Sequence, residues 1–300
     1  MEFDPSSLTL EENGVCVQRN ICNNSLCEVF LAEISKAFDR MLALPGRMSS
    51  TSSMPSLSGH RHFLTIATSP YESKMIKEKE FTHRRDFRLP YNSLMESVLL
   101  RSLNSNTVTT TLKKPNTSPT TTHHTSRTVG HILIEILGEN AELCEISVIR
   151  SEPACEGQSF HSDSEYSDSN PRLCTVFLAL HDIPEETMGP TQFYANTHHP
   201  RHFEDNLWVP PTPGNIQNQL NNYPNKCTEL WFGPLHQGDA VLMDSCTWHR
   251  GGANTSNKTR TILAISFVEE AKLTPSNNND GAQKRLKLGG FVSDEKWNDL

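Results

Sequence analysis

Hydrophobic residues recur at every fourth position in one stretch near the N-terminus, a spacing that predicts an amphipathic helix. The repeating residues are Leu26, Phe30, Ile34, Phe38 and Leu42. The capping box Ser25-Leu26-Cys27-Glu28 predicts where this helix begins, and Pro45-Gly46 predicts where it ends. We assign the apolar face of this helix to the protein core.

Two further helices are predicted before position 140. Ser93-Leu94-Met95-Glu96 is a second capping box, and it predicts a helix that continues to about Leu103. The apolar run Val129–Leu137 has the composition of either a helix or a strand, and we favour a helix that ends at Gly138.

After Asn140 the pattern changes to short β-rich runs separated by turns. These runs are residues 143–149, 159–163, 173–180, 191–194, 240–243 and 261–268. Upstream of them, Asn13-Gly14 predicts a turn before the strand Val15–Gln18, and residues 60–66 are a further candidate strand. Strands at such spacing indicate an antiparallel sandwich or barrel. Residues 173–180 are apolar on both faces and predict a central strand.

Two stretches interrupt this pattern. Residues near 46–60 are rich in Ser, Met and Pro, and residues near 104–128 are dominated by Thr, Ser, Asn and Pro. Neither stretch can bury enough apolar surface to order itself, so we expect two flexible inserts. Residues 273–300 are also polar, and we expect a loose tail. The predicted organisation is a single domain over residues 1–272, followed by that tail.

Charge and composition exclude several classes of protein. The chain has 27 basic and 35 acidic residues and a net charge of −8. This balance lacks the excess of positive charge that is typical of proteins that bind nucleic acid. No apolar run is long enough to span a bilayer, and the polar N-terminus lacks the features of a signal peptide. We therefore expect an intracellular, cytoplasmic protein. The eight cysteines are scattered without a C-x-x-C pair, which favours free thiols over disulfides or a zinc site.

The candidate chemistry begins at His161-x-Asp163. On an extended strand, residues i and i+2 point to the same face, so the imidazole and the carboxylate would project side by side. His249 follows the predicted strand at 240–243 and could complete a two-histidine, one-carboxylate site for Fe(II) with open positions. Arg260 begins the next predicted strand, which we expect to be the neighbour of the one that ends at His249. Its planar guanidinium can donate two parallel hydrogen bonds to a carboxylate, which suits the distal carboxylate of a 2-oxo acid that chelates the metal.

The sequence around these residues resembles the phytanoyl-CoA dioxygenase-like family of Fe(II)- and 2-oxoglutarate-dependent oxygenases. His161-x-Asp163, His249 and Arg260 are in register with the family pattern. The stretches Gly189-Pro-Thr-Gln-Phe-Tyr-Ala-Asn-Thr-His198 and Gly238-Asp-Ala-Val-Leu-Met-Asp-Ser245 resemble two of its flanking segments. The similarity covers about residues 8–270, interrupted by the two inserts.

The resemblance implies a mainly β fold, namely a double-stranded β-helix (jelly roll) of the cupin-like type with helices on its outer face. It implies that His161, Asp163 and His249 ligate iron and that Arg260 binds the 5-carboxylate of 2-oxoglutarate. Gln158 and Thr191 match positions that contact this co-substrate in some members. The implied reaction uses O2 to hydroxylate or otherwise oxidise an unactivated C–H bond of a small organic substrate. Succinate and CO2 are released, and ascorbate can support turnover.

Three positions depart from the family pattern. Ser162 stands where glutamine is common, Asn196-Thr197-His198 replaces Gly-Ser-His, and Gly251 replaces a Ser or Thr that helps to bind the co-substrate in some members. None of these changes removes a metal ligand. Because Asp163 is a carboxylate and not the small residue of halogenating relatives, hydroxylation or another oxidation is favoured.

Other interpretations remain open at this point. The chain could be a non-catalytic β-barrel binding protein that retains the metal motif, or a cupin-like metal enzyme that needs no 2-oxoglutarate. His181-Asp182 is a second histidine–carboxylate pair, but adjacent strand residues face opposite ways, so we favour a turn. His198, His199 and His202 could form another metal cluster, although a loop at the rim of the pocket is favoured. The sequence identifies neither the substrate nor the oligomeric state.

Overall fold

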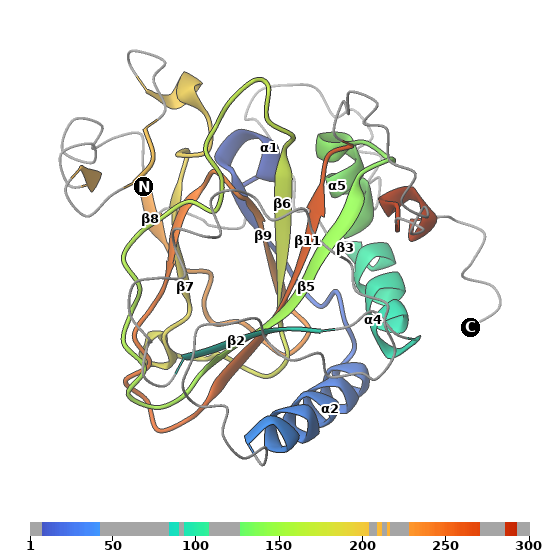
Figure 1. The fold of residues 1–300 in the computed structure, drawn as a ribbon, viewed down its shortest axis with the longest axis vertical. Helices are drawn as coiled ribbons and strands as arrows, with labels where there is room; N and C mark the ends of the chain where they lie inside the picture. The colour runs from blue at the N-terminus through green and yellow to red at the C-terminus, as the bar shows by residue number, and fades with distance from the viewer. Residues whose placement is uncertain are drawn as a thin grey trace, which may run out of the picture.

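The computed structural model describes residues 8–42, 84–89, 93–107, 127–203, 209–211, 215–216, 228–270 and 286–292. Two antiparallel sheets form its centre (Figure 1). The larger has the strand order β1-β9-β6-β11-β5-β2, and the smaller has the order β10-β7-β8. The strands of the larger sheet are β1 Val15–Gln18, β2 Arg84–Arg88, β5 Glu142–Ser151, β6 Leu173–Ala179, β9 Ala240–Asp244 and β11 Arg260–Val268. Those of the smaller are β7 Thr191–Ala195, β8 Thr228–Leu230 and β10 Trp248–Gly251.

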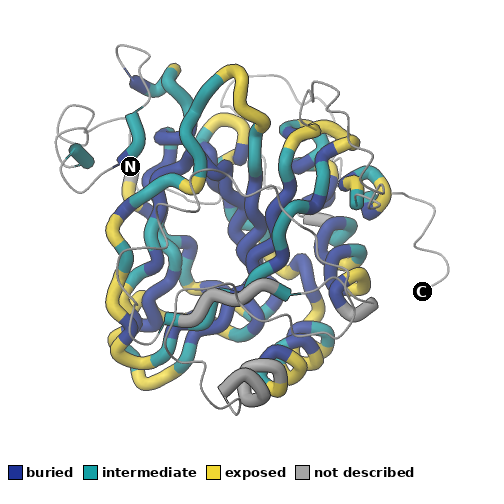
Figure 2. The backbone as a smooth tube through the Cα atoms, in the orientation of Figure 1, coloured by how far each residue is buried: buried dark blue, intermediate teal, exposed yellow. Residues whose placement is uncertain are grey.

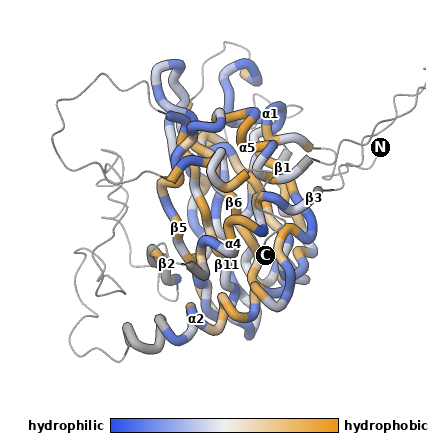
Figure 3. The backbone as a smooth tube through the Cα atoms, turned by 90° about the vertical axis from the view of Figure 1, so that its right-hand side faces the viewer, coloured by the Kyte–Doolittle hydropathy of each residue, from blue (hydrophilic) through white to orange (hydrophobic). Residues whose placement is uncertain are grey.

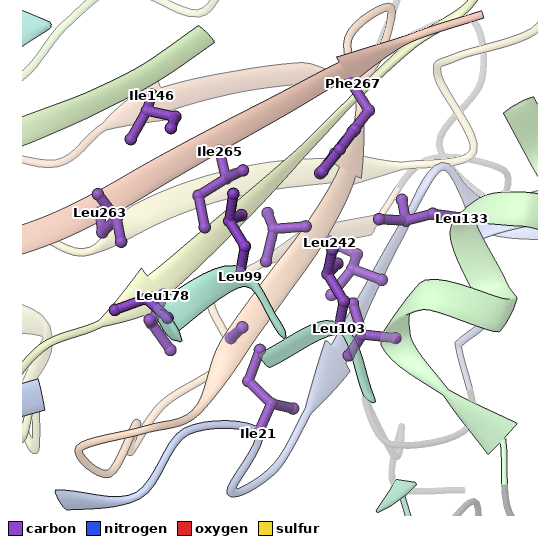
Figure 4. Close-up of a cluster of buried hydrophobic side chains, with 14 of the residues drawn as sticks. Ile21, Leu99, Leu103, Leu133, Ile146, Leu178, Leu242, Leu263, Ile265 and Phe267 are labelled. Atoms are coloured by element: carbon purple, nitrogen blue, oxygen red, sulfur yellow. The ribbon is translucent and has the colours of Figure 1, made fainter. Parts of the chain in front are cut away.

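Three helices cover one face of the larger sheet (Figures 1 and 3). They are α2 Asn24–Leu42, α4 Ser93–Asn104 and α5 Val129–Leu137, all from the N-terminal half of the chain. Figure 4 shows side chains of α4 and α5 packed against the sheet, with Leu99, Leu103 and Leu133 meeting Leu242 and Ile265. Burial of this apolar surface is the main force that holds the helices on the sheet.

A second apolar core fills the space between the two sheets. Because successive side chains of a strand point to opposite faces, β11 contributes to both cores. Leu263 and Ile265 face the helices, whereas Ile262 and Ala264 pack toward the smaller sheet. The central strands are therefore buried on both sides, and exposed residues lie mainly in the loops (Figure 2). The predicted fold class, mainly β with a jelly-roll core and outer helices, is confirmed.

Most of the predicted elements are present. The strand at 173–180 is β6, in the interior of the sheet, and the ambiguous run at 129–137 is the helix α5. The first predicted helix begins two residues earlier than its capping box indicated. Asn23, and not Ser25, is the cap, because its Oδ1 accepts a hydrogen bond from the backbone N–H of Leu26 at 2.8 Å.

Residues 159–163 do not form the strand that the pattern predicted. His161 makes a single isolated bridge, and the chain bends at Asp163. The bend has a clear cause, because the backbone N–H groups of Asp163 and Ser164 both donate to the carbonyl of Ser245, at 2.9 and 3.1 Å. Two consecutive donors cannot reach one acceptor from a fully extended chain.

Part of the stretch expected to be a loose tail is packed on the core. Residues 286–292 contain the 3₁₀-helix η4 Leu288–Gly290, and Leu288 and Phe291 are buried. The N–H of Leu288 donates to the carbonyl of Ala141 at 2.7 Å. The apolar residues in this short segment are enough to dock it, so the expectation of a loose tail was wrong for these seven residues.

Four small elements complete the described chain, namely α1 Leu10–Asn13, the 3₁₀-helices η2 Glu186–Met188 and η3 Pro200–His202, and a two-stranded ladder. The ladder pairs β3 Asn106–Thr107 with β4 Arg127–Thr128 and so joins the two ends of the second predicted insert. Residues 46–60 and the candidate strand at 60–66 lie outside the described residues. No described helix is both long and apolar enough to cross a membrane.

Candidate metal centre

Two chain segments run side by side and bring the expected metal ligands together. His161 and His249 exchange two backbone hydrogen bonds, of 2.9 and 2.8 Å, so their side chains lie next to each other on the same face. The two imidazole rings are 4.4 Å apart between centroids. The bend at Asp163 then turns its carboxylate toward both rings.

The three side chains converge on one point. Asp163 Oδ1 lies 3.9 Å from Nε2 of His161, and its Oδ2 lies 3.6 Å from Nε2 of His249. One ligand atom from each of the three residues lies within 4.8 Å of the other two. Within the described part of the chain, no other group of histidine, cysteine and carboxylate side chains gathers in this way. The sequence expectation that these residues meet is therefore matched by the geometry.

Each imidazole is held in the tautomer that a metal ligand needs. Nδ1 of His161 lies 2.9 Å from the carbonyl oxygen of Ser159, and Nδ1 of His249 lies 2.9 Å from that of Thr247. A carbonyl oxygen can only accept, so both Nδ1 atoms carry the proton, and both Nε2 atoms present a lone pair. Such hydrogen bonds to the outer nitrogen also fix the orientation of the ring.

Burial favours the neutral form of His249. It is the main cause that lowers the pKa of this side chain to about 4, and it outweighs the opposing effect of Asp163. The neighbouring His161 and the guanidinium of Arg84 lower the pKa further. At neutral pH, His249 therefore offers an uncharged donor nitrogen.

This arrangement fits a divalent cation. Two lone pairs and a carboxylate that face one another repel unless a positive charge lies between them. Two imidazole nitrogens and one carboxylate oxygen are the donor set typical of non-haem Fe(II) sites with open positions. The site is also accessible, because the Asp163 side chain is 45% exposed while that of His249 is 7% exposed. The open side of the cluster is thus the side of Asp163.

Arg260 lies on the face of the larger sheet that is turned toward the smaller one. It alternates with Ile262 and Ala264, which belong to the core between the sheets. The residue is only 1% exposed, and its Nη2 donates to Oγ of Ser151 at 2.8 Å. One detail of the prediction was wrong, since the strand that Arg260 begins is not a neighbour of the His249 strand. β11 pairs with β5 and β6, whereas β10 pairs with β7.

Gln158 and Thr191 both lie beside Gly251. The backbone N–H of Gly251 donates to Oε1 of Gln158 at 2.9 Å, and Thr191 is its partner across the smaller sheet. Thr191 also lines a narrow, mostly apolar cavity between the sheets, with Phe193 and Ile262 among the other lining residues. The side-chain oxygen of Gln158 thus connects the segment that carries His161 and Asp163 to the segment that carries His249. A contact with the co-substrate would therefore have to come from the side-chain NH2 of Gln158.

Three other histidines that the sequence offered as candidates have hydrogen-bond partners in the protein. His181 lies in a bend, as expected, and its Nε2 accepts from the backbone N–H of Thr261 at 2.8 Å. His199 contacts the hydroxyl of Tyr166 at 3.0 Å. His198 is buried, and its Nε2 lies 3.1 Å from a backbone carbonyl. Among the described residues, none of these histidines belongs to a group of side chains that could hold a second metal ion.

Sequence reasoning missed three residues of this region. Ser245 anchors the bend at Asp163, Ser151 contacts Arg260, and Arg84 reaches the centre from the edge strand β2. Ser245 ends the segment Gly238–Ser245 that resembles the family pattern, but nothing in that segment indicates its contact with Asp163, and Ser151 has no recognisable local signal. Arg84-Arg85-Asp86-Phe87-Arg88 carries four charges in five residues and lacks the alternation that reveals a half-buried strand.

Comparison with solved structures finds similar chains at low sequence identity. AviO1 from Streptomyces viridochromogenes Tue57 is 13% identical, with a TM-score of 0.52 over 90% of this chain and 97% of that chain. The carbocyclase SnoK from nogalamycin biosynthesis, described as non-heme and alpha ketoglutarate dependent, is 13% identical (TM-score 0.49, 90% and 84% covered). HygX from Streptomyces hygroscopicus, solved with nickel and 2-oxoglutarate bound, is 12% identical (TM-score 0.48, 87% and 84% covered).

The sequence itself identifies the family. A search of curated proteins finds no significant match to the chain. However, the model of the phytanoyl-CoA dioxygenase (PhyH) family matches residues 10–262, which include the three converging side chains and Arg260. This match confirms the resemblance on which the sequence predictions rest. The chain therefore belongs to the phytanoyl-CoA dioxygenase family.

Proposed function

We propose that this protein is an Fe(II)- and 2-oxoglutarate-dependent dioxygenase that oxidises a C–H bond of a small organic substrate. The observation that carries the proposal is the convergence of His161, Asp163 and His249, with both Nε2 atoms held as lone-pair donors. Membership of the phytanoyl-CoA dioxygenase family supports the same activity.

Each group of the site has a distinct role in this proposal. His161, Asp163 and His249 hold the iron, and Arg260 binds the 5-carboxylate of 2-oxoglutarate through its planar fork. When bound, Fe(II) with 2-oxoglutarate and O2 supplies the oxidising power for the C–H bond, and 2-oxoglutarate leaves as succinate and CO2. No side chain besides the metal ligands is assigned a catalytic role.

The protein supplies geometry and a dry environment. The Nδ1 hydrogen bonds keep both imidazoles aimed at the carboxylate, so no rearrangement is needed when a metal arrives. Phe193, opposite His249 in the ladder, places an aromatic ring 6.4 Å from this imidazole and walls off its inner side. Water is therefore excluded on that side, while the side of Asp163 stays open to the substrate.

The experiment that tests this function combines ligand binding with product analysis. Under anaerobic conditions, Fe(II) and 2-oxoglutarate should give a visible charge-transfer absorption, which requires a 2-oxo acid chelated to the iron. Admission of air and ascorbate should then release succinate. The control Asp163→Ala should give neither signal. Iron binding without 2-oxoglutarate binding or succinate would instead support a non-catalytic or cupin-like protein.

A further inference from the structure

An imidazole side chain extends the hydrogen bonding of the larger sheet beyond the end of strand β6. Strand β11 lies between β6 and β5 (Figure 1). The pairing of β6 with β11 ends where Ala179 is opposite Ile262. The preceding backbone N–H of β11, that of Thr261, donates instead to Nε2 of His181 at 2.8 Å. The side chain of His181 therefore acts in place of a backbone carbonyl at this end of the sheet.

His181 is held in the form that can accept this hydrogen bond. Its Nδ1 lies 2.9 Å from the carbonyl oxygen of Asp182, so Nδ1 carries the proton and Nε2 presents a lone pair. Burial is the main cause that lowers the pKa of this imidazole. The positive charges of Arg260 and Lys258 lower the pKa further, whereas Asp182 opposes them. The imidazole is therefore neutral at neutral pH.

The accepted N–H belongs to the peptide that joins Arg260 to Thr261. Arg260 is the first residue of β11, so the strand itself provides no earlier pairs that would hold it. On one side, Arg260 is paired with Ser151 of β5, whose Oγ also accepts from the guanidinium at 2.8 Å. On the other side, the backbone is held by His181. The backbone that carries the guanidinium is thus fixed from both neighbouring strands.

We propose that His181 is a positioning residue for co-substrate binding. Its neutral imidazole fixes the backbone at Arg260, so that the guanidinium meets the distal carboxylate of 2-oxoglutarate. This proposal rests on the function proposed above and on the role assigned there to Arg260. Two-point binding of a carboxylate depends on orientation, and a misplacement of about 1 Å in such a site can cost up to about 10²-fold. His181 acts through Thr261 and is not assigned a contact with the co-substrate.

Two substitutions separate the hydrogen bond from the bulk of the ring. The side-chain oxygen of His181→Gln reaches about as far as Nε2 and keeps an acceptor for the Thr261 N–H. His181→Phe keeps a ring but has no lone pair. Calorimetric titration of the Mn(II)-loaded proteins with 2-oxoglutarate should show a loss of about tenfold in affinity for His181→Phe. His181→Gln should remain within about threefold of the wild type.

Two more variants complete the series. His181→Asn has a side chain that ends before the position of Nε2, so it should lose affinity as His181→Phe does, and it replaces that variant if the phenylalanine prevents folding. His236→Phe is the matched control, because His236 is an exposed histidine 3.7 Å from the carboxylate of Asp182. This control should bind 2-oxoglutarate as the wild type does.

Metal affinity and turnover distinguish positioning from general damage to the fold. The affinity for Mn(II) alone should be the same in all of these proteins, since none of the substitutions touches a metal ligand. In succinate release, the KM for 2-oxoglutarate should rise about tenfold in His181→Phe, while kcat at saturating co-substrate stays within about twofold of the wild type. Loss of stability by itself would leave this division between KM and kcat absent.

Three outcomes would overturn the proposal. They are wild-type affinity for 2-oxoglutarate in folded His181→Phe and His181→Asn, a loss in His181→Gln as large as that in His181→Phe, and a parallel loss of Mn(II) affinity. The second result would assign His181 a role in packing only. A wild-type protein that binds neither Mn(II) nor 2-oxoglutarate would count against the proposed function itself, so the two failures are distinguishable.

Discussion

Replacement of Arg260 by alanine tests how the co-substrate is held. The wild-type guanidinium is 1% exposed and lies on the inner face of the larger sheet, where it donates one hydrogen bond to Ser151. A hydrogen bond to a charged group contributes about 1.5–3 kcal/mol, and a guanidinium fork makes two such bonds to a carboxylate. Allowing for partial replacement by water, we expect Arg260→Ala to lose about 3–4 kcal/mol, or roughly 10²–10³-fold in the Kd of 2-oxoglutarate.

Calorimetric titration of the Mn(II)-loaded protein measures this loss directly. Arg260→Lys keeps the charge but not the planar fork, so its affinity for 2-oxoglutarate should be intermediate. Ser151→Ala removes a hydrogen bond to the guanidinium and keeps its charge, and it should weaken binding only about fivefold, the effect of one ordinary hydrogen bond. The affinity for Mn(II) alone should be unchanged in all three variants. A folded Arg260→Ala protein with wild-type affinity for 2-oxoglutarate would refute the role assigned to this residue.

Three further predictions concern metal affinity and the stability of the folded protein. Gln158→Ala removes the acceptor for the Gly251 N–H and should weaken Mn(II) binding about tenfold, as loss of an outer contact does elsewhere, measured by titration. Gly189→Ala should lower the free energy of unfolding in urea by about 2 kcal/mol or more, because Gly189 has a φ of +68° and its added Cβ would lie 2.5 Å from a backbone oxygen of Gly252. Burial lowers the pKa of His198 in the folded protein to about 3. In the unfolded chain the same imidazole binds a proton near pH 6.5, whereas in the folded protein it stays neutral at that pH. Stability should therefore fall as the pH drops below 6.5, by about 2 kcal/mol from this group near pH 5, and His198→Asn should show a shallower pH dependence in urea denaturation.

The sequence was most informative where one physical cause dominates. The double-sided apolar run of β6 predicted a central strand, because only a strand covered on both faces buries all its side chains. The run Val129–Leu137 was decided correctly as a helix by the glycine that follows it. The meeting of His161, Asp163 and His249 followed from the family pattern, since 88 and 86 residues separate His249 from the other two.

The errors arose where tertiary contacts override local pattern. Asp163 faces His161 through a bend that Ser245 imposes, and not through the alternation of a strand. β2 is an edge strand rich in charge, so it has no hydrophobic alternation to detect, and Arg84 could not be placed at the site without coordinates. Segment 286–292 docks on a surface that is complete only after the core has formed. Such contacts between distant residues have no signature in either segment alone.

Metal stoichiometry tests the central claim most directly. Purified wild-type protein and two single variants, His161→Ala and His236→Ala, are equilibrated anaerobically with Fe(II), freed of excess metal and analysed for iron. His236 is the matched control, because it is an exposed histidine 3.7 Å from the Asp182 carboxylate and lies outside the centre. We predict one iron per chain in the wild type and in His236→Ala, and none in His161→Ala. Equal iron content in all three proteins, or none in the wild type, would contradict the assignment of His161, Asp163 and His249 as the metal site.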